Sequence, residues 1–217
     1  MGTDNVVERL RESYDFGAAE RDTHSKEPWK VAERAAFLDR LKAEGRQRLL
    51  EIGAGTGQDS LFFQEQGLSV VATDLSPRMV AHCRAKGLDA RVMDFWSMDF
   101  PPASFDAVYA LNCLLHVPNA QLPGVLQGIR AILRPGGLFF MGVYGSGESS
   151  EGVNERDNHR PPRFFSWRTD EQIVEFASAA FTIEDFHVAQ AGEHRCQCMT
   201  LRVPDDICTD GGVPSDR

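Results

Sequence analysis

The sequence has few of the features that mark membrane or nucleic-acid-binding proteins. No apolar run in its 217 residues reaches the roughly 20 residues that a membrane-spanning helix needs. Its formal net charge of −9 disfavours nucleic acid as a partner, because such binding depends on neutralising phosphates. The N-terminus shows no signal-peptide pattern, and five cysteines, an odd number, suit a reducing compartment. We therefore expect a cytoplasmic protein that binds neither a membrane nor nucleic acid.

Several catalytic and metal-binding signatures are missing as well. The chain contains no G-x-S-x-G motif and no phosphate-binding Walker loop, so nothing supports a hydrolase or a nucleotidase. Cys196 and Cys198 are two residues apart, whereas metal sites prefer C-x-x-C spacing with a second such pair. We therefore expect no metal, and we interpret these two cysteines as buried thiols on one face of a strand.

Three closely spaced glycines are the most informative feature that is present. An apolar run leads into Gly53, Gly55 and Gly57, and a helix-like pattern follows over residues 60–66. Glycine allows a tight turn and a close approach by a ligand, and the first turn of a helix presents unpaired N–H groups. A second apolar run ends at Asp74, the place where Rossmann-like folds hold ribose hydroxyls. This arrangement predicts a site for a nucleoside cofactor.

Glu51 and the glycine spacing indicate which cofactor this is. The spacing is G-x-G-x-G, without the sixth-position glycine that is typical of dinucleotide sites. Glu51 lies two residues before the first glycine, where it would repel a pyrophosphate and attract a cation. S-adenosylmethionine carries an amino group and a sulfonium, and it has no phosphate. The pattern therefore favours S-adenosylmethionine and disfavours a dinucleotide-dependent reductase.

With these motifs the chain resembles the class I S-adenosylmethionine-dependent methyltransferases, in particular those that act on small molecules. Segments similar to that family's motifs occur in the family's order between roughly residues 49 and 145: Glu51–Gly57, Asp74, Met93–Phe95, Phe105–Tyr109 and Leu133–Gly137. The resemblance implies a Rossmann-like α/β fold with a seven-stranded, mostly parallel sheet. It also implies helices on both faces of the sheet, an antiparallel last strand, and S-adenosylhomocysteine as the product.

The hydrophobic pattern agrees with a single domain of alternating strands and helices over residues 1–204. We expect an N-terminal helical lid over 1–45 that is interrupted by a polar segment over 14–28, and a loose polar tail over 205–217. The expected strands cover residues 49–52, 69–73, 90–93, 105–110, 138–144, 182–188 and 197–203, with a turn over 190–195. The expected helices after the first apolar stretch cover residues 29–41, 60–66, 76–86, 122–133 and 169–180.

The resemblance also implies roles for the polar residues at the carboxyl ends of the strands. Glu51 would face the amino group of the cofactor, and Asp74 would accept both ribose hydroxyls. Asp94 would accept the exocyclic amine of adenine, with Phe95 or Leu75 covering the ring. The alternative is that the glycines form only tight turns and the acids only cap helices. The full predicted set of cofactor-binding residues is Glu51, Gly53, Ala54, Gly55, Gly57, Gln58, Asp74, Leu75, Met79, Asp94, Phe95, Asn112 and Cys113.

Methyl transfer depends on alignment of the acceptor with the methyl group and on exclusion of water. A base is needed only if the acceptor must lose a proton. His116 is our first candidate, because it follows the fourth strand and a histidine titrates near neutral pH. Its alternative role is to fix its loop by hydrogen bonds. Tyr14 is the second candidate, while Asn112 and Cys113 would lie beside the sulfonium.

The segment over residues 145–168 is the predicted acceptor side, since it begins at the same edge of the sheet. An arginine there, Arg163 or Arg168, could bind an acceptor carboxylate. Three aromatic residues could line an apolar pocket, although a surface loop leading into a helix is an equally good interpretation. These aromatic residues are Phe164, Phe165 and Trp167. The residues predicted to bind the acceptor are Tyr144, His159, Arg163 and His194.

These features together predict a methyltransferase that modifies an oxygen or nitrogen atom of a small metabolite or natural product. The segment Ala110–Cys113 lacks the Asn/Asp-Pro-Pro-Tyr or Phe motif that many methyltransferases of planar nitrogens carry. A peptide or protein acceptor is the first alternative. The second is a protein that binds S-adenosylmethionine without catalysis. We expect a monomer or a homodimer.

Overall fold

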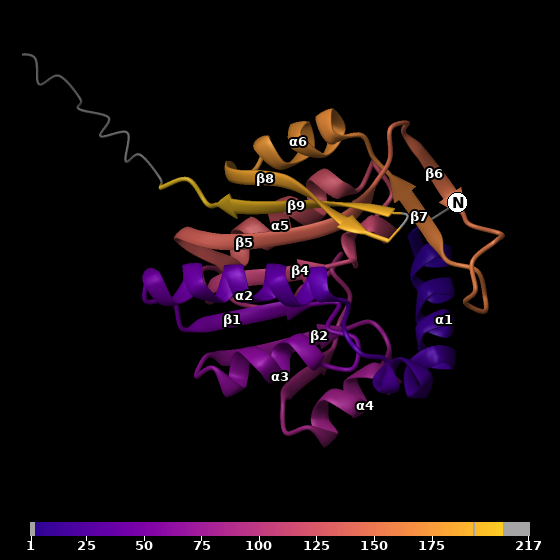
Figure 1. The fold of residues 1–217 in the computed structure, drawn as a ribbon, viewed down its shortest axis with the longest axis horizontal. Helices are drawn as coiled ribbons and strands as arrows, with labels where there is room; N and C mark the ends of the chain where they lie inside the picture. Colours follow the sequence, from indigo (N-terminus) through magenta and orange to yellow (C-terminus); the bar gives the residue numbers. More distant parts are fainter. Residues whose placement is uncertain (1–2, 193, 206–217) are drawn as a thin grey trace, which may run out of the picture.

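The computed structural model describes residues 3–192 and 194–205, and these contain a seven-stranded sheet with helices on both faces (Figure 1). The strand order is β3-β2-β1-β4-β5-β9-β8. Strands β1 to β5 are parallel, whereas β9 is antiparallel to both of its neighbours. The predicted fold class is therefore confirmed. The strand bounds are Arg48–Ile52 (β1), Ser69–Asp74 (β2), Asp89–Val92 (β3), Phe105–Leu111 (β4), Leu133–Gly145 (β5), Thr182–Ala191 (β8) and His194–Arg202 (β9).

Helices cover both faces of the sheet because its central strands are apolar on both sides. Leu49 of β1 packs with α2 and α3, while the next residue, Leu50, packs with α5 and α6 on the opposite face. α4 packs over β2 and β3 on the same face as α3. None of the described helices is long and apolar enough to cross a membrane. The helix bounds are Thr3–Thr23 (α1), Pro28–Ala43 (α2), Gln58–Glu65 (α3), Pro77–Ala85 (α4), Leu122–Ile132 (α5) and Asp170–Ser178 (α6).

The starts of α4 and α6 are set by capping side chains that can be recognised in the sequence. Ser76 accepts a hydrogen bond from the backbone N–H of Met79, and a proline occupies the first turn of α4. Thr169 and Gln172 form a reciprocal capping box at the start of α6. These contacts fix where the helices begin relative to the strands before them.

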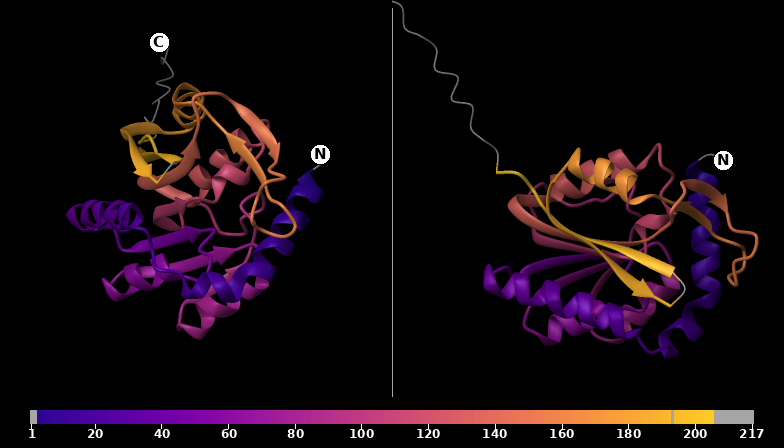
Figure 2. Two further views of the ribbon diagram at one scale, coloured as in Figure 1. Left: turned by 45° about the vertical axis from the view of Figure 1, so that its right-hand side comes forward. Right: turned by 45° about the horizontal axis from the view of Figure 1, so that its top comes forward.

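The prediction of a polar break after residue 14 is wrong, because α1 runs unbroken from Thr3 to Thr23. Its buried side chains, Val6, Leu10, Ser13 and Ala18, recur every three to five residues and form a narrow stripe. The remaining positions are mostly polar, so the mean hydropathy of the segment hides this stripe. α1 stands across the carboxyl ends of the parallel strands instead of packing on a face of the sheet (Figure 2).

Two further segments differ from the expected pattern. The expected loop over 145–168 contains a second, two-stranded sheet formed by β6 (Ser150–Val153) and β7 (Phe164–Trp167), which lies beside α1. Strands β8 and β9 extend to Ala191 and from His194, so the turn between them is shorter than predicted. The predicted tail over 205–217 lies outside the described residues from 206 onward.

Candidate functional site

The turn after β1 depends on glycine at two positions. Gly53 has φ of 67°, and a Cβ atom there would lie 2.4 Å from Cβ of Cys113. Gly57 has φ of 82°, and a Cβ atom would lie 2.7 Å from Leu88 and 2.9 Å from Sγ of Cys83. Both the left-handed conformation and the close packing exclude a side chain. The first glycine thus brings β1 close to the end of β4, and Gly57 lets α3 begin beside α4.

Asp74 lies at the end of β2 with its side chain held by backbone groups. Its Oδ2 accepts the N–H of Gly55 at 2.8 Å, and its Oδ1 accepts the N–H of Ser76 at 2.9 Å. The residue is only 8% exposed, and burial raises the pKa of its carboxyl to about 6. Each carboxylate oxygen has a further lone pair available. A fixed carboxylate of this kind can accept two hydroxyl groups of a ligand.

Glu51 is a carboxyl group buried in β1. The residue is 4% exposed, and its Oε2 accepts a hydrogen bond from the hydroxyl of Ser60. Burial raises the pKa of Glu51 above its usual range, and the nearby charge of Asp59 raises it further. A cation placed at this carboxyl would favour its ionised form and be attracted by it.

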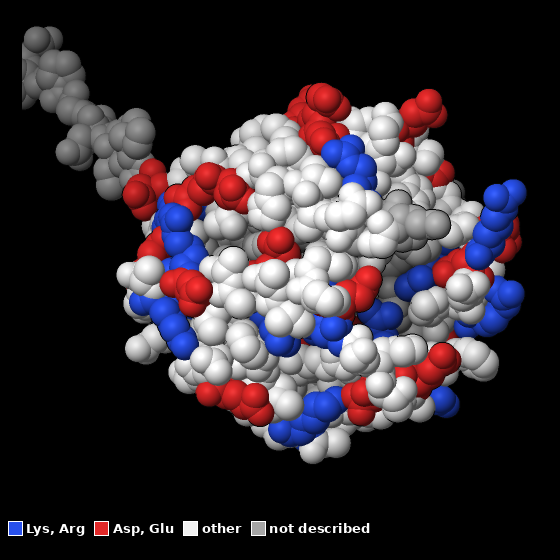
Figure 3. Space-filling view, in the orientation of Figure 1, with Lys and Arg blue, Asp and Glu red and all other residues white. Residues whose placement is uncertain are grey.

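Two adjoining cavities open where these residues meet. The larger has a volume of about 370 Å³ and extends from Glu51 and Gln58 to the start of α2. The smaller, of about 50 Å³, lies between Asp74 and α1. In the space-filling view, Lys and Arg atoms lie in the hollow between α2 and α1 (Figure 3). The residues that line both cavities are Arg21, Gly53, Gly55, Leu111 and Asn112.

The structure brings ten of the thirteen predicted cofactor-binding residues to these cavities. Those lining the larger cavity are Glu51, Gly53, Ala54, Gly55, Gln58 and Asn112. Those lining the smaller cavity are Gly53, Gly55, Asp74, Leu75, Phe95, Asn112 and Cys113. These residues come from the ends of β1, β2 and β4 and from the segment after β3. The carboxyl edge of the sheet therefore concentrates them as the topology requires.

Three of the predicted residues line neither cavity. Gly57 packs against α4 as described above, and Met79 is buried within α4. Asp94 accepts the backbone N–H groups of Trp96 and Ser97, both at 2.8 Å, and so forms a turn after β3. The contact of Asp94 with adenine stays a prediction.

Asn112 lines both cavities, and Cys113 lines the smaller one. Asn112 has φ of 56°, a left-handed conformation that is uncommon for a residue with a side chain. The Cys113 thiol donates to the carbonyl oxygen of Ile52 at 3.2 Å, and burial raises the pKa of this thiol. The thiol is therefore a packing and hydrogen-bonding group instead of a nucleophile.

Tyr14 and His116 are hydrogen bonded across 102 positions of the chain. His116 is buried in the 3₁₀ helix η1 (Leu114–His116), and its Nδ1 lies 2.6 Å from the carbonyl oxygen of Phe164. A carbonyl can only accept, so Nδ1 carries the proton and the neutral Nε2 accepts from the Tyr14 hydroxyl at 2.6 Å. Nη1 of Arg163 donates to the same hydroxyl at 2.9 Å. Burial, aided by the charge of Arg163, lowers the pKa of His116 to about 3.

The other predicted acceptor residues lie around this group. Arg163 donates to both carboxylate oxygens of Asp157, and the His159 ring meets the Tyr14 ring edge-on at 5.8 Å. Burial lowers the pKa of His159. Tyr144 lies apart, with its ring stacked on Trp167 at 6.4 Å. His194 begins β9, and its side chain lies outside the described residues.

Arg168, the alternative to Arg163 as an acceptor ligand, is buried and structural. Its guanidinium donates to Asn119 and to the carbonyl oxygens of Leu114 and Val117. Of the predicted aromatic residues, Phe164 and Phe165 are buried, and Trp167 is partly exposed. These contacts anchor β7 to η1, and of the two predicted arginines only Arg163 contacts a residue that lines a cavity, Tyr14.

Sequence reasoning predicted Tyr14 and an N-terminal lid, but it missed Leu10 and Arg21, the other residues of α1 that line the cavities. Leu10, Tyr14 and Arg21 of α1 line the smaller cavity, and Arg21 also lines the larger one. Arg21 falls in the segment that was expected to be a polar break, so nothing pointed it toward the glycine turn. The four-residue spacing of Leu10, Tyr14 and Ala18 is the signal that could have revealed the helix.

Comparisons with known proteins agree with this architecture. The profile of the methyltransferase domain family matches residues 49–137. An uncharacterized methyltransferase of Synechocystis sp. is 26% identical over 60% of this chain and 56% of its own length. Demethylmenaquinone methyltransferase of Tropheryma whipplei is 34% identical over 48% of this chain and 44% of its own length. The chain thus spans about half the length of these curated relatives.

A solved structure covers nearly the whole chain. It is a Burkholderia thailandensis 1,6-didemethyltoxoflavin-N1-methyltransferase, with that substrate and S-adenosylhomocysteine bound. The structural match has a TM-score of 0.73 and 26% identity, and it covers 94% of this chain and 92% of the other. The fold, the motif order and these relatives lead to one conclusion. Residues 49–137 therefore form a methyltransferase domain of the class I, S-adenosylmethionine-dependent type.

Proposed function

We propose that this protein transfers a methyl group from S-adenosylmethionine to an oxygen or nitrogen atom of a small molecule. The observation that carries the proposal is the pair of adjoining cavities that join the buried carboxyls of Glu51 and Asp74 at one sheet edge. When bound, the cofactor supplies a methyl group, which the lone pair of the acceptor takes as the carbon–sulfur bond breaks. The chain's task is to bind, to align and to exclude water.

The residues present fit a ligand with ribose hydroxyls at one end and a charged amino acid at the other. Asp74 offers a fixed bidentate acceptor beside the apolar side chains of Leu75 and Phe95. Glu51 offers a buried carboxyl for an ammonium group. Among the described residues, no carboxylate forms an ion pair with Arg21, so its guanidinium is available for a ligand carboxylate.

α1 acts as the lid in this proposal. Ligand cavities are typically about 300–1,000 Å³, so the smaller cavity of about 50 Å³ cannot admit a nucleoside as it stands. Leu10 and Tyr14 form its α1 wall, and movement of this helix would enlarge it. Return of α1 would then cover the bound nucleoside and exclude water.

The acceptor site in this proposal lies beside the Tyr14–His116–Arg163 group. The Tyr14 hydroxyl is held between a donor and an acceptor, so it can orient an acceptor atom by exchanging one hydrogen bond. His116, with its pKa lowered to about 3, is neutral at physiological pH and acts on the acceptor only through Tyr14. The Burkholderia relative is named an N1-methyltransferase of 1,6-didemethyltoxoflavin, which supports a nitrogen acceptor in a small molecule.

The proposal is tested by incubating the protein with S-adenosylmethionine and each member of a panel of acceptors. The quantity measured is the S-adenosylhomocysteine that forms. The panel contains small heteroaromatic amines, phenols, carboxylic acids and short peptides, with the Asp74→Ala variant at limiting cofactor as the control of lowered activity. We expect product with at least one small molecule and none with peptides. Tight S-adenosylhomocysteine binding without turnover of any compound would contradict catalysis and indicate a cofactor-binding protein. Turnover of peptides alone would contradict the small-molecule acceptor.

A further inference from the structure

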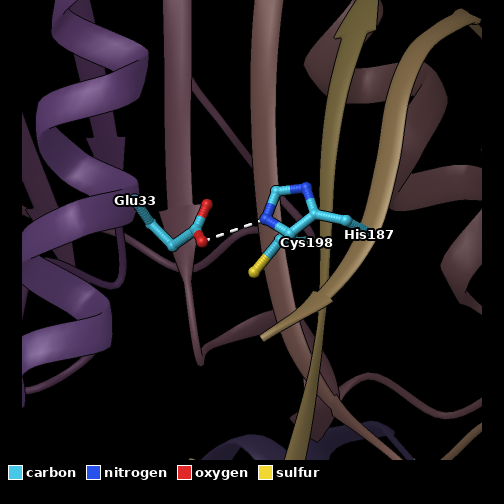
Figure 4. Close-up of side chains that lie close together, drawn as sticks. All are labelled: Glu33, His187 and Cys198. Atoms are coloured by element: carbon cyan, nitrogen blue, oxygen red, sulfur yellow. Dashed lines mark hydrogen bonds and ion pairs between the residues drawn. The ribbon is translucent and has the colours of Figure 1, made fainter. Parts of the chain in front are cut away.

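Three potential metal ligands meet between α2 and the far edge of the sheet. His187 of β8 and Cys198 of β9 are direct partners in the antiparallel register, so both side chains lie on the same face. Glu33 of α2 projects toward them from the helix that covers this face (Figure 4). The cluster is separate from the glycine turn, and none of its residues lines either cavity.

The distances suit a single ion. Oε1 of Glu33 lies 3.0 Å from Nε2 of His187, and these atoms and Sγ of Cys198 all lie within 4.8 Å of one another. Metal–ligand bonds of about 2.0–2.3 Å in a tetrahedral site place the ligand atoms roughly 3.3–3.8 Å apart. The three ligand atoms therefore lie within about 1 Å of the spacing that such a site needs.

Asp185 provides a second, independent indication of metal binding. Its Oδ2 lies 2.6 Å from Nδ1 of His187, the ring nitrogen that faces away from the cluster. Histidines that bind metals commonly donate this second N–H to a carboxylate, which orients the ring and raises the basicity of the binding nitrogen. Here the same contact turns Nε2 toward Glu33 and Cys198.

The exposure of the three side chains also fits an ion that enters from solvent. Cys198 is buried and Glu33 has a side chain only 12% exposed, whereas the His187 side chain is 46% exposed. The exposed side leaves solvent free to supply a fourth ligand. One thiolate, one imidazole and one carboxylate form a donor set suited to zinc or a similar divalent transition metal.

We propose that Glu33, His187 and Cys198 bind one divalent ion of the zinc type, with Asp185 as the positioning residue for His187. Binding releases the thiol proton of Cys198 and the proton between His187 and Glu33, so ligand charge balances the ion. The ion joins α2 to the β8–β9 pair. Lys30, one turn before Glu33, lines the larger cavity, so the ion also steadies that wall. This proposal does not depend on the proposed methyl transfer.

Titration of the reduced protein with Co²⁺, followed by displacement with Zn²⁺, tests the site. Co²⁺ bound to a thiolate has an ultraviolet charge-transfer absorption, which we expect to saturate at one ion per chain and to vanish on adding Zn²⁺. Cys198→Ser should lose this absorption, whereas Cys83→Ser, a matched buried cysteine on α4, should retain it. Asp185→Asn should retain the absorption and bind roughly 10- to 100-fold more weakly.

Variants of the two ligands that are less buried than Cys198 keep the test decisive if Cys198→Ser does not fold. Glu33→Gln and His187→Asn should each weaken Co²⁺ binding at least tenfold, and Zn²⁺ should raise the melting temperature of the wild-type protein but not of these variants. The proposal is overturned if the wild-type protein shows no thiolate absorption. It is equally overturned if Glu33→Gln and His187→Asn both bind Co²⁺ as tightly as the wild type, because the cluster is then only a set of ion pairs.

Discussion

The two sides of the nucleoside cavity are built in different ways. On the sheet side, Asp74 is fixed by the backbone N–H groups of Gly55 and Ser76, which are 19 and two positions away. On the side of α1, the contacts join side chains that are far apart in the sequence. Tyr14 is 102 positions from His116 and 149 from Arg163. The sheet side is therefore specified by local turns, and the cover is specified only by the complete fold.

This difference predicts different behaviour of the two sides. The glycine turn is closely packed, since a side chain at Gly53 or Gly57 would collide with its neighbours. α1 is held by the packing of Val6 and Leu10 on Phe164 and by a few polar contacts, such as the donation from Arg9 to the carbonyl oxygen of Pro162. We expect a rigid cofactor floor beneath a cover that opens, and changes on the two sides should separate cofactor affinity from turnover.

The largest expected effect comes from removing the fixed carboxylate of the floor. Asp74→Ala should weaken S-adenosylhomocysteine binding by about 1–3 kcal/mol, because a charged acceptor of ribose hydroxyls is lost. Calorimetry measures this effect, with Asp89→Ala, an exposed acid at the start of β3, as the control. An unchanged affinity in the Asp74 variant would show that Asp74 is only a structural residue.

His116 gives the next effect, on the stability of the folded protein. Its pKa is about 3 in the folded protein and about 6.5 when unfolded. The unfolded chain therefore takes up a proton first as the pH falls, so this histidine destabilises the folded state progressively from pH 6.5 toward pH 3. Between pH 7 and pH 5 the loss should be about 2 kcal/mol. Chemical denaturation of His116→Asn should show a smaller loss over this range, and an equal loss would place the histidine in solvent.

Glu51 should make the affinity for the cofactor depend on pH. Burial and Asp59 raise its pKa in the free protein, and an ammonium group would lower that pKa on binding. Binding then releases a proton, so affinity for S-adenosylhomocysteine should rise with pH from 6 to 8, by up to about tenfold per pH unit. The Glu51→Gln variant should lose this pH dependence. A wild-type affinity independent of pH would argue that no cation meets this carboxyl.

The smallest expected effect comes from Tyr14 on α1, where a substitution should change turnover but not cofactor affinity. Tyr14→Phe removes one hydrogen bond to His116 and one from Arg163. Turnover at saturating cofactor should fall about fivefold, equivalent to about 1 kcal/mol, while S-adenosylhomocysteine affinity changes by less than about twofold. Phe16→Leu, a change at an exposed position of the same helix, should alter neither quantity. A large loss of cofactor affinity in Tyr14→Phe would show that the two sides are not separable.

The sheet side of the nucleoside cavity was predictable from the sequence, whereas much of the α1 side was not. Strands such as Leu49–Ile52 and the acids at their ends were predictable, because each is a contiguous run and parallel strands place their carboxyl ends together. α1 was misjudged because its few buried side chains lie among mostly polar residues. The Glu33, His187 and Cys198 cluster was missed because Glu33 is 154 positions from His187, and only strand register makes His187 and Cys198 neighbours.

A calorimetric titration with S-adenosylhomocysteine, with NADH as the comparison ligand, tests the central claim most directly. Both ligands carry an adenosine, but only NADH carries a pyrophosphate that Glu51 would repel. The proposed site should bind S-adenosylhomocysteine with a micromolar dissociation constant and bind NADH undetectably. Preference for NADH, or no binding of S-adenosylhomocysteine, would contradict the assignment of the glycine turn and of the cavities above it.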